Sequence, residues 1–577
     1  AVIAVAAAGI LLRNPAHALD TRRVAVAALE NRTADASLDN LGLMAADWVT
    51  QGLAQTGLVE VVPSVSLMTT ASQSGRAGLR DAAAIQALGR ATGAGTVVTG
   101  GYYRQGDSVR FHVQITAADD GTVLRALEPV VGSLAEPLHA VEILRQRVTA
   151  ALATLFDARL NRWAMTASQP PTLEAYQHFI AGLDRFVQLD PPGAIEHFER
   201  AAAADTAFWL PLIFAANAHM NIGAFAAAES LAHVVAAHSA QLAPLDRAYL
   251  AWVLAICRGD REAAYQASRA MADLAPASET VYLLAGDALS LNRPRAAVEA
   301  LRGLGPDRGF TRGWWVYWDD LTTALHMLGE HRDELKEAAE GRRRFPESLH
   351  MLTAQARALA ALGRTAEVRR LLAAGGSFET ELGWSPADAM LLAAAELRAH
   401  GQPPAADSVL ATTRRWLTER AAADSLSPVY RYRVAVNAFA MGRLDEARRE
   451  FERLSGRGTL GPGTHRAHRT HPIFELPAEQ LEYLGHLGAI AAREQNRADA
   501  LQVAATLAEL RHPFLFGRHT LWRARIHAWL GERDVAVALV REGMRQGYPN
   551  MPTLHADPAF AALRDYPPFQ ALLTPKG

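Results

Sequence analysis

Apolar positions along most of the chain recur at helical spacing, and polar residues occupy the opposite face. In the stretch that begins at Gly442, a small residue, Ala447, lies five positions after the glycine, and Phe451 follows four positions later. The same opening, a turn residue followed after four positions by a small or apolar residue, recurs at Gly223, Gly259, Asn292, Gly329, Gly363, Gly401, Asn496 and Gly531. Neighbouring turns lie 33 to 41 residues apart, except for 54 residues between Gly442 and Asn496.

A period of about 34 residues that is helical in both halves predicts stacked helical hairpins and resembles the tetratricopeptide repeat (TPR). An earlier hairpin is expected from Thr172, a plausible N-cap, through the turn at Pro191 to Ala202, which makes ten helix pairs. The proline-broken segment from Tyr548 onward is interpreted as a cap. We expect an elongated all-α solenoid, on the order of 100 Å along its curve.

The amino-terminal part has a different pattern, in which short apolar runs alternate with two amphipathic stretches and with turn signals at Gly106 and Gly121. The predicted strands span residues 23–29, 59–62, 96–103, 109–116 and 122–131, and the predicted helices span 37–56, 80–92 and 135–160. This part of the chain is therefore predicted to be an α/β module.

Three stretches of this module carry a resemblance: Arg23–Thr33, the helix that contains Gly42, and Val97–Phe111. They resemble the amino-terminal domain of the TolB type, although Ala28-Leu29 replaces the usual Pro-Phe. Joined to TPR hairpins, such a domain is similar to the extracytoplasmic half of bacterial single-span serine/threonine kinases and transcriptional regulators. The kinase or DNA-binding half is absent from this sequence. The resemblance implies a non-catalytic interaction domain, with no catalytic residues.

The predicted organisation has three parts. Residues 1–18 form a membrane-anchor remnant or signal-like segment, 19–164 the TolB-like domain, and 165–577 the solenoid with an insertion at 455–474. The apolar run Ala1–Leu12 would be about 18 Å long as a helix, too short to span a bilayer alone. It is interpreted as the tail of a membrane helix, as a signal-peptide segment with a cleavage site at Ala16-His17-Ala18, or as an ordinary buried segment. The first two readings predict a periplasmic protein, anchored to the membrane by its amino terminus in the reading we adopt.

The charge composition of the chain indicates which classes of partner to expect. The 58 basic and 60 acidic side chains balance to a net charge of −2, so no overall field attracts nucleic acid. Cys257 is the single cysteine of the chain and lies in an apolar helical pattern, which predicts a buried, unreactive thiol.

Two regions stand out as candidate binding surfaces. The densest aromatic cluster contains Trp314, Trp315, Tyr317 and Trp318; on a helix Trp315 would point away from the other three. These rings are interpreted either as hairpin core or as an aromatic patch that anchors a peptide or a subunit. Tyr430 and Tyr432 open another first helix and are expected on the same side.

The insertion is rich in Gly, Arg and His. Gly456–Gly461 matches G-x-G-x-x-G but lacks the preceding strand that a dinucleotide site requires. His465, His468 and His471 are interpreted as part of a loop that contacts a partner or the neighbouring hairpin, with metal binding as the alternative. No metal ligand and no cofactor is predicted.

The sequence shows no P-loop, G-x-S-x-G, H-E-x-x-H, C-x-x-C or kinase signature, so an enzyme is not expected. The leading hypothesis is a membrane-tethered scaffold for protein–protein interactions, for instance an extrinsic subunit of a membrane complex. The alternative is a ligand-sensing ectodomain of a bacterial signalling kinase or regulator, and a third hypothesis is a hydrolase that uses the histidine-rich insertion.

Overall fold

The computed structural model describes residues 19–56, 58–62, 82–156, 172–274, 280–307, 313–380, 383–424, 427–456, 478–549 and 552–576. Contacts divide the chain into two compact units. The first holds the α/β module with parts of the first hairpins (residues up to 184, 196–211 and 240–243), and the second holds 185–195, 212–239 and 244 onward. The predicted domain boundaries therefore remain a prediction.

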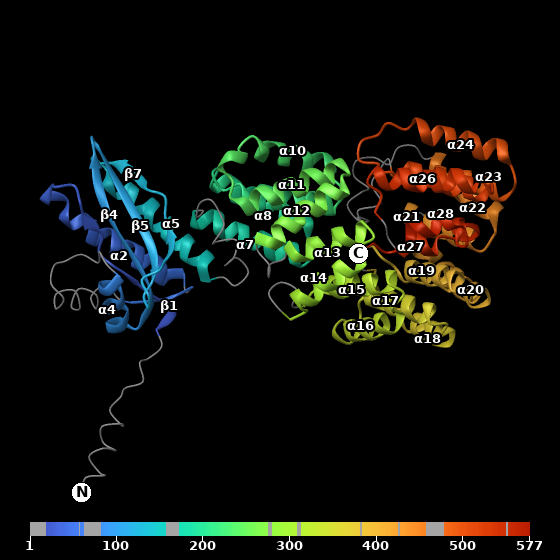
Figure 1. The fold of residues 1–577 in the computed structure, drawn as a ribbon, viewed down its shortest axis with the longest axis horizontal. Helices are drawn as coiled ribbons and strands as arrows, with labels where there is room; N and C mark the ends of the chain where they lie inside the picture. The colour runs from blue at the N-terminus through green and yellow to red at the C-terminus, as the bar shows by residue number, and fades with distance from the viewer. Residues whose placement is uncertain are drawn as a thin grey trace, which may run out of the picture. The chain divides into compact units, whose positions relative to one another are not determined.

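The amino-terminal module is built on one mixed sheet, seen as the blue strands of Figure 1. The strands are β1 (Asp20–Val26), β2 (Glu30–Asn31), β3 (Glu60–Val61), β4 (Ala94–Gln105), β5 (Ser108–Ala117), β6 (Val123–Ala126) and β7 (Val130–Ser133). The main order is β3-β1-β4-β5-β6, in which β1 runs parallel to β3 and β4, while β4, β5 and β6 are antiparallel. The single strand predicted over 122–131 is thus divided into β6 and β7, which both pair with β5.

Helices cover both faces of this sheet, because successive side chains of a strand point to opposite faces. Val24 and Val26 belong to the core formed with α2 (Asp39–Thr56) and α5 (Pro137–Phe156). Ala25, which lies between them, belongs to the smaller core formed with α4 (Ala82–Thr92). A Cβ at Gly42 would lie 2.0 Å from the carbonyl oxygen of Leu29. Only glycine at this position therefore allows α2 to approach the sheet so closely. The predicted α/β module is confirmed.

Helical hairpins make up the rest of the described chain. The ten hairpins are α7 (Leu173–Val187) with α8 (Pro191–Ala204), α9 (Leu210–Asn221) with α10 (Phe225–Ala236), α11 (Pro244–Arg258) with α12 (Arg261–Leu274), α13 (Thr280–Ser290) with α14 (Pro294–Leu304), α15 (Val316–Met327) with α16 (His331–Arg344), α17 (Leu349–Ala361) with α18 (Thr365–Gly375), α19 (Pro386–Ala399) with α20 (Pro403–Asp424), α21 (Pro428–Ala440) with α22 (Leu444–Gly456), α23 (Ala478–Arg493) with α24 (Arg497–Glu509), and α25 (Arg518–Trp529) with α26 (Arg533–Arg545). The predicted TPR-like solenoid is confirmed.

A left-handed residue closes the first helix of each hairpin. The Gly442 amide donates a hydrogen bond to the carbonyl of Phe439, and the Arg443 amide donates one to the carbonyl of Ala438. These two hydrogen bonds cap the end of α21. The eight turn residues that share this conformation have φ between 59° and 79°: Gly223, Gly259, Asn292, Gly329, Gly363, Gly401, Gly442 and Gly531. The turn predicted at Asn496 lies one residue earlier in the structure. Gln495 has the left-handed conformation (φ 63°), and Asn496 is the N-cap residue of α24.

Five positions after the left-handed residue, nine of the ten hairpins have a buried alanine or valine. Ala447 and Ala536 are both fully buried. The equivalent residues are also fully buried: Ala194, Ala228, Ala264, Ala297, Val368, Ala406 and Ala500. Helices can approach closely only where such side chains are small, so this position fixes the geometry of the hairpin.

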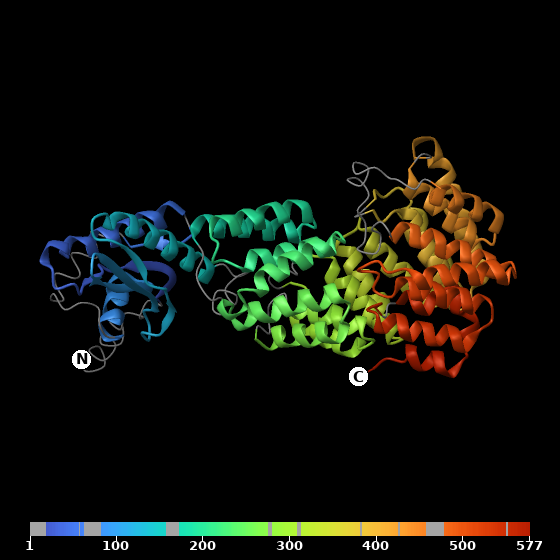
Figure 2. The same ribbon diagram turned by 90° about the horizontal axis from the view of Figure 1, so that it is seen from above.

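The second unit closes on itself, which contradicts the predicted elongated array. The ring of Phe225 stacks on that of Phe514 at 5.8 Å, and Arg261 donates to the carbonyl of Gly547 at 2.9 Å. The Asn292 side chain donates to the Thr574 carbonyl, and the Lys576 amide donates to the Asn292 carbonyl. In Figures 1 and 2 the C-terminus accordingly lies beside the green and yellow hairpins.

The carboxy-terminal segment forms α27 (Pro552–Ala556), a 3₁₀ helix (Pro558–Leu563) and α28 (Pro567–Leu573). Phe560 and Phe569 are buried in the core of α25 and α26, as a cap on the last hairpin requires. The short helix α27 also contacts α15 and α19 in the middle of the array. The segment therefore connects the end of the solenoid to its centre.

Two further expectations have different outcomes. Cys257 is free and buried, which confirms the predicted burial, and burial raises the pKa of its thiol to about 11, which disfavours the reactive thiolate. The residues of the predicted anchor, 1–18, lie outside the described residues. Within the described part of the chain, no helix combines the length and the apolar composition needed to cross a bilayer, so the structure does not bear out the predicted membrane anchor or the periplasmic location inferred from it.

The hairpin geometry predicts the effect of a large charged side chain at the small position. Ala536→Arg should lower the free energy of unfolding by about 1–3 kcal/mol or more, because it overpacks the contact and buries a charge. The neighbouring Val535→Arg is the control, since Val535 is 43% exposed and should tolerate the change. Chemical denaturation compares the two, and equal midpoints would show that Ala536 is not an interhelical contact.

A buried carboxyl gives the array a pH dependence. Burial raises the pKa of Asp287 from 3.8 to about 6, although the Ser268 hydroxyl and the Trp252 indole, which donates at 2.8 Å, oppose this shift. A raised folded-state pKa stabilises the fold fully below about pH 4, and the contribution is lost as the pH rises through about 6.

Relative to Asp287→Asn, the wild type should therefore lose about 3 kcal/mol of unfolding free energy between pH 4 and pH 7. Urea denaturation across this range measures the difference. Asp273→Asn, which changes an exposed carboxyl on α12, is the control and should follow the wild type. A constant offset between Asp287→Asn and the wild type would contradict the shift.

Candidate functional site

The hairpin of α15 and α16 departs from the repeat at the small position. Five residues after Gly329 the chain has Glu334, whose side chain is fully buried although the other hairpins have alanine or valine there. Burial of a carboxylate is unfavourable unless charged or hydrogen-bonding partners surround it. The partners of Glu334 therefore identify a polar centre inside an otherwise apolar array.

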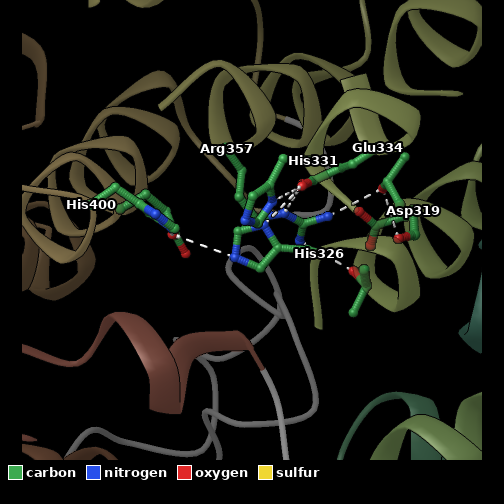
Figure 3. A network of polar contacts seen from close by, with 9 residues as sticks. Asp319, His326, His331, Glu334, Arg357 and His400 are labelled. Carbon is green, nitrogen blue, oxygen red and sulfur yellow. Dashed lines mark hydrogen bonds and ion pairs between the residues drawn. The ribbon is translucent and has the colours of Figure 1, made fainter. Parts of the chain in front are cut away.

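Three side chains meet the Glu334 carboxylate, as Figure 3 shows. Oε2 lies 2.9 Å from Nδ1 of His326 and 3.1 Å from Nδ1 of His331, while Nε of Arg357 donates to Oε1 at 2.8 Å. His326 comes from the last turn of α15, His331 and Glu334 from the first turn of α16, and Arg357 from α17. Two consecutive hairpins are thus joined through one carboxylate.

Arg357 is itself buried and almost fully hydrogen-bonded. Its two terminal nitrogens each donate at 3.2 Å to a threonine hydroxyl of α15, those of Thr322 and Thr323. Burial alone would raise the pKa of Glu334, but the charges of Arg357 and His326 outweigh it and hold this pKa well below its usual range. Glu334 is therefore a carboxylate at neutral pH.

A second buried carboxylate, that of Glu396, lies on the other side of His326. Its Oε2 is 3.5 Å from Nε2 of His326 and 3.6 Å from Nε2 of His400. Glu396 lies in the last turn of α19 and is 2% exposed, and His400 is the C-cap residue of the same helix. We call the six residues His326, His331, Glu334, Arg357, Glu396 and His400 the polar cluster.

The carboxy-terminal segment adds one more imidazole near the cluster. His555 lies on α27, which contacts α15 and α19, and its Nε2 is buried without a hydrogen-bond partner among the described residues. Burial, and then the charge of His326, lowers the pKa of His555 to about 4. A neutral imidazole with an unused ring nitrogen therefore lies close to the polar cluster.

The donor atoms of the cluster are those that bind divalent transition metals. Two triads each place one donor atom per residue within 4.8 Å of the others: His326 with Glu396 and His400, and His326 with His331 and Glu334. The two triads share His326. The threonine hydroxyls in this region are hydrogen-bonded to Arg357, so the cluster does not resemble an activated nucleophile with a base.

The aromatic residues proposed from sequence divide into two groups. Tyr317 and Trp318 lie in the hairpin core. Trp314 and Trp315 precede α15, which begins at Val316, so helical spacing does not apply to them. The Trp314 ring packs edge-on against that of Tyr282 at 4.7 Å.

Trp315 belongs to a stack of rings from three consecutive hairpins. Its ring lies 4.1 Å from that of His350 at an interplanar angle of 14°, and the His350 ring lies 5.9 Å from that of Trp384 at 24°. All three side chains are partly exposed, and they lie at the amino-terminal ends of α15, α17 and α19. We call Trp315, His350 and Trp384 the aromatic ladder.

The other proposed binding residues lie elsewhere. The Tyr430 hydroxyl donates to the carbonyl of Leu417 at 2.8 Å, and the Tyr432 ring contacts those of Phe451 and Tyr483. Both tyrosines therefore join neighbouring helices of later hairpins. His465 and His468 lie outside the described residues.

The sequence patterns described above do not predict the polar cluster. One signal was present, because Glu334 occupies a position that is alanine or valine in the other hairpins. His331, three residues earlier, and the pair Glu396 and His400, spaced by four on one helix, would then have pointed to the same place.

The cluster predicts that alanine is harmful at the hairpin where the repeat has neither alanine nor valine. Glu334→Ala leaves Arg357 buried without its carboxylate and should cost about 3–5 kcal/mol of unfolding free energy. Glu340→Ala, which removes a surface carboxylate of the same helix, should have little effect. Adding Arg357→Leu to Glu334→Ala should restore much of the loss in chemical denaturation; a single variant as stable as the wild type would contradict the pairing.

Comparisons with known proteins find similar solved structures but no similar family or curated sequence. A scan against protein-family models finds no match, and a search of curated proteins finds no similar sequence. Similar solved structures include a tetratricopeptide repeat protein from Parabacteroides merdae (14% identity, 47% of this chain and 93% of that chain, TM-score 0.28). Yeast Tom70 (10%, 75% and 96%, TM-score 0.31) and the human IFIT1 dimer with PPP-AAAA (12%, 64% and 90%, TM-score 0.29) are others. These TM-scores are low, so the assignment of the fold rests on the hairpins themselves.

Proposed function

We propose that this chain is a non-enzymatic scaffold that binds other proteins through its hairpin array. The observation that carries the proposal is the aromatic ladder, in which three consecutive hairpins present partly exposed rings at equivalent ends of their first helices. Tryptophan supplies a large contact area at a low cost in conformational entropy, and it is enriched where binding energy concentrates in interfaces.

The ladder is held in place before any partner binds. The Trp384 indole donates to the Thr353 hydroxyl of the preceding hairpin at 3.1 Å, which fixes the ring against α17. Beyond Trp384, Arg433 pairs with Asp388 at 2.7 Å and extends the same row of contacts to the next hairpin. A surface that is already ordered loses less entropy on binding. An extended segment with apolar or aromatic side chains fits such a row of rings.

Two finer forms of this function differ in the partner. As a subunit of a larger protein complex, the chain would hold a stable protein neighbour; as a ligand-sensing domain of a bacterial signalling protein, it would hold a peptide or small ligand. The likeness of the amino-terminal module to TolB-type domains belongs to this proposal, as a second interaction module. The row of rings along three hairpins favours a protein segment over a small ligand.

The test is association with whatever protein co-purifies with the chain from its native source. Trp315→Ala and Trp384→Ala should each weaken this association by about 1–3 kcal/mol, roughly 5-fold to 150-fold, while leaving the helical circular dichroism unchanged. Val234→Ala removes an exposed apolar side chain from α10 and is the matched control. Full association of both tryptophan variants would place the binding surface elsewhere on the chain.

A further inference from the structure

The spacing around Glu396 differs from that of ordinary hydrogen bonds. Its contacts with Nε2 of His326 and of His400 measure 3.5 and 3.6 Å, beyond the range of about 2.7–3.2 Å for an N–H···O bond. Two ligands of a tetrahedral Zn²⁺ ion, each bound at about 2.1 Å, are separated by about 3.4 Å. Both contacts of Glu396 therefore have the separation of two ligands of one ion, and one donor atom of each of the three residues lies within 4.8 Å of the others.

The ring nitrogens are also oriented for a cation. Nδ1 of His326 faces the Glu334 carboxylate at 2.9 Å and can donate its proton there, so Nε2, which faces Glu396 and His400, is the nitrogen that would give up its proton to a bound cation. A carboxylate that holds the far nitrogen of a histidine is the usual outer partner of a metal-binding imidazole. Arg357 in turn fixes Glu334, so the outer partner is itself held in place.

Charge and helix direction favour a cation at the same point. Arg357 forms an ion pair with one buried carboxylate of the cluster, that of Glu334, while the contacts of Glu396 within the cluster are with the imidazoles of His326 and His400. His326 lies in the last turn of α15, and Glu396 and His400 lie at the end of α19. Helix carboxy-termini carry partial negative charge, so two such ends converge on this place.

We propose that His326 Nε2, Glu396 Oε2 and His400 Nε2 form a Zn²⁺ site. A set of two histidines and one carboxylate matches the ligands that Zn²⁺ takes at three-ligand sites, where a fourth position stays open. The His331 ring lies nearby, with its centroid 4.9 Å from that of His326 and 5.3 Å from that of His400. His555, with its buried free Nε2, approaches the cluster from α27.

The proposed ion links hairpins that are not neighbours in sequence. Its ligands come from α15 and α19, while the hairpin of α17 and α18 lies between them in the chain. Zinc would therefore hold two first helices, α15 and α19, together at their carboxy-terminal ends. This role does not depend on the proposed binding of a protein partner, so either can fail without the other.

The experiment uses the full chain, stripped of metal with a chelator and shown to remain helical by circular dichroism. Zn²⁺ titrated against a chromogenic competitor should bind with one tight equivalent per chain and should raise the thermal midpoint. His400→Ala and Glu396→Gln each remove a ligand and should weaken binding more than Glu334→Gln, which alters the outer partner and is expected to cost about 10–100-fold. Co²⁺ in place of Zn²⁺ should give the visible absorption of a tetrahedral site.

Two controls separate this site from other histidines. His350→Ala changes a histidine of the aromatic ladder, and deletion of Gly456–Thr470 removes His465 and His468; both variants should keep the tight equivalent. Absence of tight Zn²⁺ binding by the folded, metal-free chain would overturn the proposal. Tight binding that survives both His400→Ala and Glu396→Gln, or that is lost with the deletion instead, would also overturn it.

Discussion

Close contact between two helices at a buried small side chain is the constraint on which the array depends. A left-handed turn residue such as Gly442 directs the second helix back along the first, and Ala447 then lets the two backbones approach. Each hairpin buries its apolar face mainly against its neighbours, and nine of the ten hairpins repeat the same local solution. An exception at this position must be compensated by the surrounding hairpins.

Glu334 is that exception, and its compensation links parts of the chain that are distant in sequence. The carboxylate is held by Arg357 from the next hairpin and by two imidazoles, one of which, His326, also faces Glu396 of the hairpin after that. A buried charge network contributes less to stability than an apolar core of the same volume, because desolvation opposes it. Its presence at the centre of the array therefore calls for a role other than simple packing.

The sequence predicted what depends on short-range patterns. The period, the turn residues and Ala447 located the hairpins, and the alternation in Arg23–Leu29 located the sheet, because each signal lies within one element. Closure of the second unit was not predicted, since it results from small rotations summed over many hairpins. The polar cluster was not predicted because Glu396 and His326 are 70 residues apart, and nothing local to either residue shows that they meet.

Three residues of the polar cluster lie on the same helices as the aromatic ladder. Trp315, His350 and Trp384 stand at the amino-terminal ends of α15, α17 and α19, whereas His326, Arg357 and Glu396 lie farther along the same helices. A helix of 12 residues such as α15 is about 18 Å long and behaves as a rigid rod at this length. Contacts that fix the spacing of the three helices at one end therefore fix the spacing of the rings at the other. The cluster would thus supply the rigidity that the proposed binding surface requires, whether an ion or hydrogen bonds hold it together.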